Sequence, residues 1–204
     1  MSRVGRRNGR VKRKPTTQRA RTVVDAPPAT VNVFPSSLGW IAVVTRGETV
    51  EQLVFGFASP DEAVRAIDEA EVGTARGTAW SRRLAARLQA YADGGGDDFR
   101  DVKVLEESWT PFQQDVLKAC RRIPYGRTLG YSELADAAGY PRAARAVGNV
   151  MANNCLPLIV PCHRVLAAGG RLGGYSNRLG LAMKKRLLAL EATNPGPKRR
   201  ATRH

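Results

Sequence analysis

The sequence is poor in the residues that form disulfides and metal sites. Its 204 residues include three cysteines and two histidines, of which His204 is the last residue of the chain. An odd, small number of cysteines provides no paired disulfide framework, and with one internal histidine a Cys/His zinc site is not expected. We therefore predict no metal and free thiols, which need a reducing compartment.

Long apolar runs are also lacking. No stretch is long enough to span a membrane, and the basic N-terminus is not followed by the apolar core of a signal peptide. At the same time 43% of the residues are hydrophobic, so a chain of this length can bury a good core. The sequence predicts a soluble intracellular protein of one domain or two small ones, without a membrane partner.

Acidic residues are absent from both ends. Residues 1–22 contain nine Arg or Lys, residues 195–204 contain four, and neither segment has an acid. The rest of the chain has 20 basic and 18 acidic residues, so the net charge of +15 lies mostly in the ends. Such segments bury too little apolar surface to fold, and they attract phosphate groups without reading a sequence. We predict disordered tails over residues 1–29 and 194–204, which serve phosphate binding or else solubility or targeting.

Residues 30–105 are predicted to form a small α/β domain, a sheet with helices. Strand-like segments on either side of a turn at residues 46–48 predict a hairpin within residues 31–57. Ser59, followed by a proline and a glutamate, predicts the N-cap of a helix that runs to about Ala70. A second helix ends at three glycines, and no catalytic residue is expected from this domain. The apolar stripe of the second helix consists of Trp80, Leu84, Leu88 and Tyr91.

Residues 106–193 are predicted to form a mainly α domain. Thr110, followed by proline and glutamine, predicts a capped helix on whose buried face Cys120 is a core residue without a functional role. Two further helices, over residues 132–138 and 142–152, flank a turn that contains glycine. Two short helices across such a turn indicate a helix-turn-helix, here of a winged-helix-like kind.

The second helix of this motif has small side chains at its exposed positions. Arg142 and Arg145 are its only long polar residues. Base edges in a major groove are read by Asn, Gln, Arg or Glu, whereas small side chains let the backbone approach a nucleic acid closely without reading its sequence. A helix packed tightly against its neighbour would have the same composition, so both interpretations stay open at this point. The small residues are Ala143, Ala144, Ala146 and Gly148.

The most informative segment is Pro-Cys-His-Arg-Val at residues 161–165. The apolar residues 158–160 before it predict a buried strand, which the proline ends because it donates no ladder hydrogen bond. Cys162 and His163 then lie at the edge of the core, where an activated thiolate can face a pocket. Neighbouring side chains of an extended segment point apart, so we do not expect a direct hydrogen bond between these two.

This segment resembles the active-site motif of the O6-alkylguanine-DNA alkyltransferases, the repair proteins that take an alkyl group from guanine onto their own cysteine. The resemblance extends from Trp109 to Glu191, and over this length the other segments of the family occur in the family's order. They are Thr110-Pro111-Phe112-Gln113, Ile123-Pro124-Tyr125-Gly126-Arg127, Tyr131-Ser132, Arg142-Ala143-Ala144-Arg145-Ala146-Val147-Gly148, Asn154, Gly174-Tyr175-Ser176 and residues 184–191.

The resemblance implies DNA repair by direct reversal. A methyl or larger alkyl group would pass irreversibly from O6-alkylguanine in DNA to Cys162, once per molecule and without a cofactor; O4-alkylthymine stays open as a second substrate. In the family a glutamate orients the histidine, which reaches the cysteine through a water molecule, and the matching residues here are Glu191 and His163. Because nothing in the sequence suggests a group that cleaves the resulting thioether, we expect stoichiometric inactivation.

The resemblance also assigns residues that handle DNA. Tyr131 would rotate the phosphate on the 3′ side of the target and help the guanine to leave, and Arg145 would fill the gap left by the extruded base. Asn154 would be the hinge before the active-site segment, although Cys155 replaces the proline that usually follows it. We favour a buried Cys155 over the alternative of a partly exposed second thiol near the site. The helix contacts with DNA, in the minor groove in the family, would come from Arg142, Ala143, Ala144 and Gly148. The pocket for the flipped guanine would be formed by Pro157, Val165, Tyr175 and Ser176.

The predicted partner is double-stranded DNA that contains O6-alkylguanine, bound by a monomer in the cytoplasm at the nucleoid, or in the nucleus of a eukaryote. Three other classes of protein are weighed against this one. A non-catalytic damage-binding relative would lack the reactive cysteine, which is present as Cys162. A cysteine hydrolase would need a base in direct contact and an oxyanion hole, and a transcriptional regulator would need a sensor domain for which the chain has little room. Methyl transfer to Cys162 separates the first hypothesis from the others.

Overall fold

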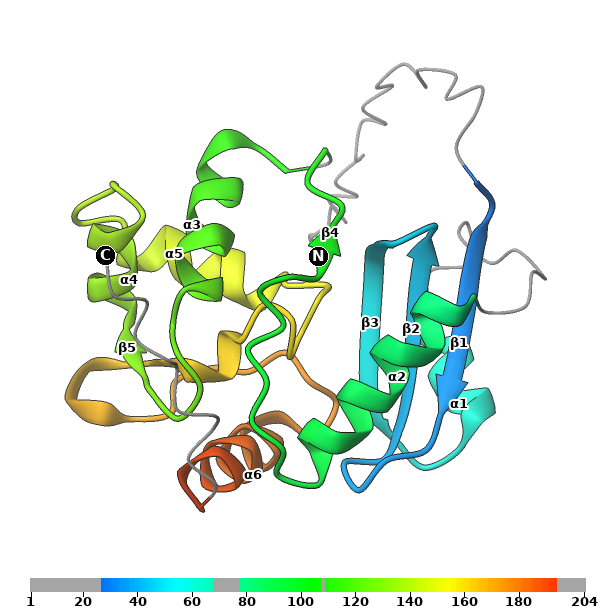
Figure 1. Cartoon of the computed structure of the whole chain (residues 1–204). Helices are drawn as coiled ribbons and strands as arrows, with labels where there is room; N and C mark the ends of the chain where they lie inside the picture. Colours follow the sequence, from blue (N-terminus) through cyan, green and yellow to red (C-terminus); the bar gives the residue numbers. More distant parts are fainter. Residues whose placement is uncertain (1–26, 68–77, 108, 194–204) are drawn as a thin grey trace, which may run out of the picture.

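The computed structural model describes residues 27–67, 78–107 and 109–193, so the predictions for the two tails fall almost entirely outside the described residues. An N-terminal part (residues 27–107) is built on a sheet, and a C-terminal part (residues 109–193) is built of helices (Figure 1). The two parts lie side by side. This arrangement confirms the predicted fold class of an α/β unit followed by a mainly α unit.

The sheet of the N-terminal part has the strand order β1-β2-β3-β4. β1, Ala29–Phe34, pairs antiparallel with β2, Trp40–Arg46, which pairs antiparallel with β3, Thr49–Phe57. The turn between β2 and β3 contains Gly47 at φ 61°, a conformation that glycine adopts without strain, and this confirms the predicted hairpin. The short β4, Lys103–Val104, pairs parallel with β3.

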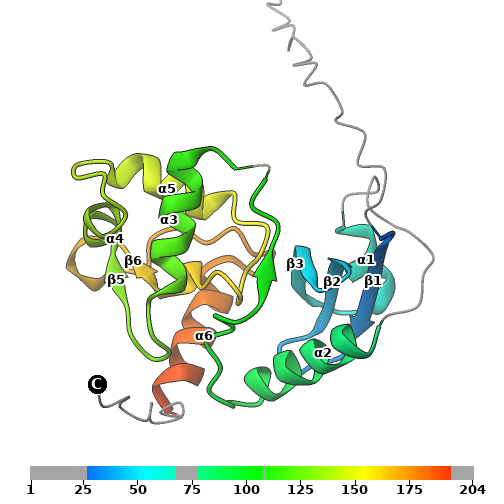
Figure 2. The ribbon, with the colours of Figure 1, turned by 45° about the horizontal axis from the view of Figure 1, so that its top comes forward.

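Helices cover both faces of this sheet (Figure 2). α1, Pro60–Arg65, begins at the predicted cap Ser59, and the predicted end at Ala70 lies outside the described residues. α2 spans Ala79–Ala92 and carries the predicted apolar stripe. Because successive residues of β2 point to opposite faces, the strand is buried on both sides. The buried residues of α2 include Leu84, Leu88 and Tyr91.

The C-terminal part begins with a capped helix. α3, Pro111–Arg121, opens with the predicted capping box: the Thr110 hydroxyl accepts from the Gln113 amide at 3.3 Å, and the Gln113 side chain accepts from the Thr110 amide at 2.9 Å. These two bonds satisfy backbone donors that the first helical turn leaves unpaired. Cys120 is buried on α3, as predicted.

α4, Tyr131–Ala137, and α5, Ala144–Ala152, form the predicted helix-turn-helix. α5 begins two residues later than predicted, because Arg142 has a left-handed backbone at φ 69° and belongs to the turn. Beside α4 lies a parallel pair of short strands, β5, Leu129–Gly130, and β6, Val165–Leu166.

The predicted strand at residues 158–160 is wrong. These residues form an irregular buried turn in which Leu158 has φ 72°, and a single bridge joins Pro157 to Val160. The apolar run is buried, as its composition requires, but within the described residues it is not paired with any named strand. It leads into a 3-10 turn, η2, Cys162–Arg164, against which α6, Gly180–Thr193, packs.

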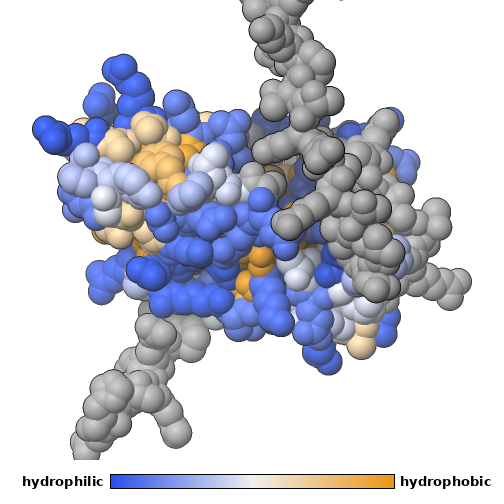
Figure 3. Space-filling model, turned by 90° about the horizontal axis from the view of Figure 1, so that it is seen from above, coloured by the Kyte–Doolittle hydropathy of each residue, from blue (hydrophilic) through white to orange (hydrophobic). Residues whose placement is uncertain are grey.

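The two parts are joined by a common core. One cluster of buried apolar side chains runs through both, and the Leu53 amide in β3 donates to the Cys155 carbonyl at 2.9 Å. Most of the described surface seen from above is hydrophilic (Figure 3). Among the helices of the described ranges, none has both the length and the apolar composition to cross a membrane. The boundary between two domains near residue 105 stays a prediction.

Candidate active site

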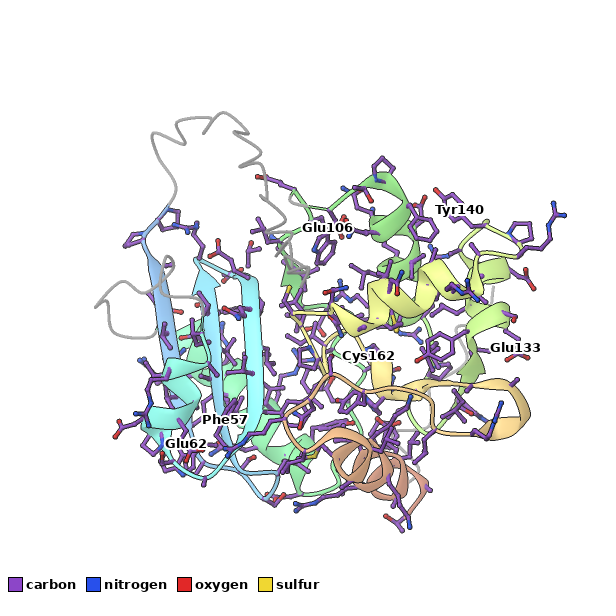
Figure 4. All side chains as sticks on the ribbon, turned by 180° about the vertical axis from the view of Figure 1, so that it is seen from behind. Phe57, Glu62, Glu106, Glu133, Tyr140 and Cys162 are labelled. Carbon is purple, nitrogen blue, oxygen red and sulfur yellow. The ribbon has the colours of Figure 1, made fainter. Side chains whose placement is uncertain are left out.

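The segment around Cys162 lies where the two parts of the molecule meet (Figure 4). Pro161, at φ −79° and ψ 64°, turns the chain into η2, and the Cys162 amide donates to the Val160 carbonyl at 2.8 Å. Cys162 is 5% exposed, and the side chains of His163 and Arg164 are buried. The tight turn therefore fixes three chemically active side chains at the edge of the core.

Asn154 connects α5 to the sulfur of Cys162. Its Nδ2 donates to the Cys162 Sγ at 3.2 Å and to the Val160 carbonyl at 2.9 Å, while its Oδ1 accepts from the Leu156 amide at 3.0 Å. An amide that donates to sulfur favours the thiolate over the thiol. The burial favoured for Cys155 is wrong, and the alternative of an exposed thiol holds: Cys155 lines the cleft between the two parts, and its carbonyl accepts from the Leu53 amide of β3.

The His163 imidazole is held by Glu191 and not by the Cys162 sulfur. The His163 Nε2 lies 2.8 Å from the Glu191 Oε1, and among the described contacts no hydrogen bond joins the imidazole to the sulfur, as predicted. An ionised carboxylate only accepts, so Nε2 carries the proton and the neutral ring has its lone pair on Nδ1. That Nδ1 atom is buried and has no hydrogen-bond partner among the described residues.

Glu191 accepts hydrogen bonds from several sides. The Arg164 guanidinium donates to both carboxylate oxygens at 2.9 to 3.1 Å, and the Gly126 amide donates to Oε2 at 2.9 Å. Tyr91, from α2, donates its hydroxyl to Oε1 at 2.6 Å. The expectation that the N-terminal part supplies no functional group is therefore incomplete, since Tyr91 touches the site. Helical spacing identified Tyr91 as buried, but spacing contains no information about its partner.

Burial and neighbouring charges lower the pKa values of Glu191 and His163 and raise that of Cys162. Burial raises the pKa of Glu191, but the hydrogen bonds and charges of His163 and Arg164 outweigh it and lower that pKa to about 2. Burial lowers the pKa of His163, which therefore stays neutral near pH 7. Burial also raises the pKa of Cys162, a shift that the Asn154 amide and the charge of Lys184 partly offset. The resting sulfur is a thiol that needs a base.

Lys184 is a further buried charge that sequence reasoning left without a role. Its Nζ donates to the Val165 carbonyl at 2.6 Å and to the Gly174 carbonyl at 3.3 Å. Burial lowers the pKa of Lys184, while the nearby Cys162 opposes this shift. Lys184 thus ties the segment after Cys162 to the loop before Tyr175, and its charge favours a thiolate.

Cys162 lines two cavities. One, of about 480 Å³, brings together six of the residues that the sequence singled out. The other, of about 320 Å³, opens between β3 and the active-site segment, and its lining includes Asn154 and Pro157. Arg142, Ala143 and Val165 line neither of these two cavities. The six residues at the first cavity are Tyr131, Arg145, Gly148, Cys162, Tyr175 and Ser176.

A wider groove of about 980 Å³ continues from Tyr131 over the first turn of α5 to the loop after β6. Ala144, Arg145 and Gly148 line it, so the small residues of α5 face open space at this side. Within the described ranges, no group of three or more His, Cys, Asp and Glu side chains is placed to hold a metal ion.

The C-terminal part matches a known family. Residues 111–193 match the family model described as "6-O-methylguanine DNA methyltransferase, DNA binding domain". The chain is 45% identical over 113 residues to a methylated-DNA–protein-cysteine methyltransferase of Methanosarcina barkeri, an alignment that covers 55% of this chain and 69% of the relative. The chain belongs to the methylated-DNA–protein-cysteine methyltransferase family.

Further relatives extend the likeness beyond the C-terminal part. A methylated-DNA–protein-cysteine methyltransferase of Mycobacterium tuberculosis is 49% identical over 105 residues, 52% of this chain and 61% of the relative. The crystal structure of Mycobacterium tuberculosis OGT in complex with DNA matches 80% of this chain and 93% of its own length, with 32% identity and a TM-score of 0.65. As a member of this family, the protein repairs O6-methylguanine in DNA by direct reversal, as a methyltransferase whose acceptor is a protein cysteine.

Proposed function

We propose that Cys162 is the acceptor of the methyl or alkyl group, with His163, Glu191 and Asn154 as its supporting residues. The observation that carries this proposal is the placement of Cys162: it lines both cavities, its sulfur accepts a hydrogen bond from Asn154, and it lies in the same turn as His163, which Glu191 of α6 holds. Cys120 is buried and lines neither cavity, and the exposed Cys155 lines only the smaller one.

The reaction moves one proton and one alkyl group. The thiol proton of Cys162 passes to His163 Nδ1 through a water molecule, and Glu191 stabilises the positive ring that forms. The sulfur attacks the alkyl carbon, the C–S bond forms, the bond from carbon to guanine O6 breaks, and its electron pair goes to the guanine. The proton then neutralises the guanine, and Cys162 remains a thioether. We identify no group among the described residues that would cleave this thioether, so each molecule is expected to react once.

The larger cavity is the proposed pocket for the flipped guanine. The Tyr175 hydroxyl is buried there without a hydrogen-bond partner among the described residues, so a polar base edge would satisfy it. Ser176 lines the same cavity. Tyr131 and Arg145 line both this cavity and the adjoining groove. We propose that Tyr131 rotates the phosphate on the 3′ side of the target and that Arg145 fills the gap left in the duplex. The remaining proposed contacts are Pro157 and Val165 with the base, and Arg142, Ala143, Ala144 and Gly148 with the DNA backbone.

The proposed partner is duplex DNA that contains O6-alkylguanine, bound by one copy of the chain. The Mycobacterium tuberculosis relative was crystallised in complex with DNA, and the basic ends of this chain would add attraction to phosphate. We place the protein inside the cell, because a free nucleophilic thiol persists in a reducing compartment.

Mass spectrometry of the protein after mixing with a duplex that contains a single O6-methylguanine tests the proposed acceptor. We expect a gain of one methyl group per molecule, located on the peptide that contains Cys162 and absent from Cys162→Ala. Cys155→Ser is the matched control, because it removes the exposed thiol and should react like the unchanged protein. Binding to the duplex without any methyl gain, with the free thiol confirmed, would make a damage-binding protein the leading hypothesis.

A further inference from the structure

Tyr91 is the one polar side chain of α2 that reaches the active-site charges among the described contacts. Its hydroxyl donates to the Glu191 Oε1 at 2.6 Å and lies 3.3 Å from the His163 Nε2. The same carboxylate oxygen accepts from His163 at 2.8 Å. Tyr91 therefore touches both members of the pair that is proposed to take the proton from Cys162.

The ring of Tyr91 is held in place by its neighbours. It packs against Phe99, with ring centroids 5.6 Å apart, and edge-on against Tyr125, with centroids 5.9 Å apart. The end of α2 is tied to the loop before β2, where the Ser37 hydroxyl donates to the Ala92 carbonyl at 2.6 Å. A fully buried ring with this packing places its hydroxyl, and through it the Glu191 oxygen, with little freedom.

Neutralising the charge of Glu191 does not require Tyr91. Arg164 already contacts both carboxylate oxygens, and the Gly126 amide adds a further donor. What Tyr91 adds is a short, directional bond to the one oxygen that also holds the Nε2 proton of His163. The bond from Tyr91 is therefore suited to control the orientation and basicity of the His163 imidazole, and it is not needed to balance the charge of Glu191.

We propose that Tyr91 is a positioning residue for the alkyl transfer: its hydroxyl fixes Glu191, which in turn orients His163 and limits how strongly the ring holds a proton. The N-terminal part thus completes the active site, and the family segment of residues 111–193 is incomplete without it. This inference rests on the proposed roles of Cys162 and His163.

The expected effect follows from the sharing of one acceptor oxygen. Donation from Tyr91 draws electron density from Oε1, so the carboxylate stabilises a positive His163 less than it otherwise would. The ring then stays neutral at pH 7, consistent with its lowered pKa, and can accept a proton. The other charged and titratable groups around Tyr91, His163 and Glu191 are Arg164, Lys184, Asp98, Tyr125 and Cys162.

Tyr91→Phe in the full chain tests the proposal, because it removes the hydroxyl and keeps the ring. Tyr125→Phe is the matched control: its ring touches that of Tyr91, and its buried hydroxyl has no hydrogen-bond partner in the described part of the chain. Two quantities are measured across pH, the single-turnover rate of methyl transfer and the NMR titration of the His163 imidazole. The chain has two histidines, so the signals of His163 and His204 are readily separated.

For Tyr91→Phe we expect the acid limb of the rate profile and the His163 titration to move together to higher pH by about one unit. Tyr125→Phe should follow the unchanged protein, and duplex affinity should stay the same in both variants. The proposal is overturned if Tyr91→Phe keeps the original midpoints and only loses rate or stability at every pH, or if both variants shift equally. Failure of the unchanged protein to methylate would instead reject the proposed function, while the imidazole titration would still report on Tyr91.

Discussion

At the level of single residues, the site contains two buried titratable side chains, Glu191 and His163, whose surroundings lower both pKa values for different reasons. Glu191 remains ionised because Arg164 and His163 stabilise its negative charge, and His163 remains neutral because its burial disfavours a positive charge. The neutral His163 can accept a proton while the ionised Glu191 holds the ring in place, as a general base requires. Burial keeps Cys162 a thiol until that base acts.

Asn154→Ala should make the thiol of Cys162 harder to ionise. The change removes the donor that lies 3.2 Å from the sulfur, so the pKa of Cys162 is expected to rise further, by about one unit. The measurement is the pH dependence of iodoacetamide alkylation at Cys162, followed by peptide mass in a Cys155→Ser background that removes the exposed thiol. A titration that coincides with that of the Cys155→Ser protein would show that the amide does not act on the sulfur.

At the scale of elements, α5 combines a buried apolar face with an exposed face of small side chains. Val147, Val150 and Met151 are buried, while Arg145 is exposed and Gly148 lines the groove and the larger cavity. A glycine within a helix lowers helix stability, so its presence at Gly148 has a local cost. Close approach of the helix backbone to DNA would explain why that cost is retained.

Gly148→Ala separates helix stability from DNA contact. An added Cβ would lie 3.9 Å from the Tyr131 ring, an ordinary contact, so the substitution fits the free protein. We expect the free energy of unfolding to rise by about 0.5 to 1 kcal/mol and affinity for undamaged duplex to fall several-fold. Urea denaturation and fluorescence anisotropy measure the two effects. A stabilised variant with unchanged affinity would mean that Gly148 does not meet the DNA.

At the scale of the whole molecule, the N-terminal and C-terminal parts are joined at the active site. Tyr91 contacts Glu191, and the Asn177 side chain donates to the Phe55 carbonyl of β3 at 3.1 Å. The buried charges at this junction are therefore part of the interface that holds the two parts together. The free energy of unfolding should therefore depend on pH through the protonation of these groups.

The free energy of unfolding is expected to fall as the pH is lowered. The pKa of His163 is lower in the folded protein than its ordinary value of 6.5, so the unfolded chain takes up a proton first and stability declines below about pH 6.5. The pKa of Glu191 is also depressed, from 4.5 to about 2, so its contribution is present above pH 4.5 and disappears as the pH falls toward 2. A shift of that size corresponds to about 3 kcal/mol.

Urea denaturation at a series of pH values measures this dependence. Glu191→Gln is the diagnostic variant, because it cannot titrate and should lose most of the decline below pH 4.5. It should also be less stable at pH 7, since the buried charge of Arg164 then loses the nearer of its two carboxylate partners and keeps only Asp98. Parallel curves for the two proteins below pH 4.5 would show that other groups control acid unfolding.

Features that depend on neighbouring residues could be predicted before the fold was known. The capping box at Thr110, the hairpin and the buried stripe of α2 follow from spacing along the chain, whereas the family was identified by the resemblance of its motifs. Such features are set by local geometry and side-chain periodicity, which a sequence displays directly. The strand expected at residues 158–160 failed because an apolar run specifies burial, and pairing needs a partner strand that the run cannot reveal.

Contacts between groups that are distant along the chain could not be predicted, because they depend on the complete fold. Tyr91 and Glu191 are 100 residues apart, and their contact depends on how α2 packs against α6 across the junction of the two parts. The exposure of Cys155 and the buried bonds of Lys184 were likewise settled by packing. A buried polar group must find a partner, but the sequence does not say which of many distant groups it will be, because that choice is made by the whole fold.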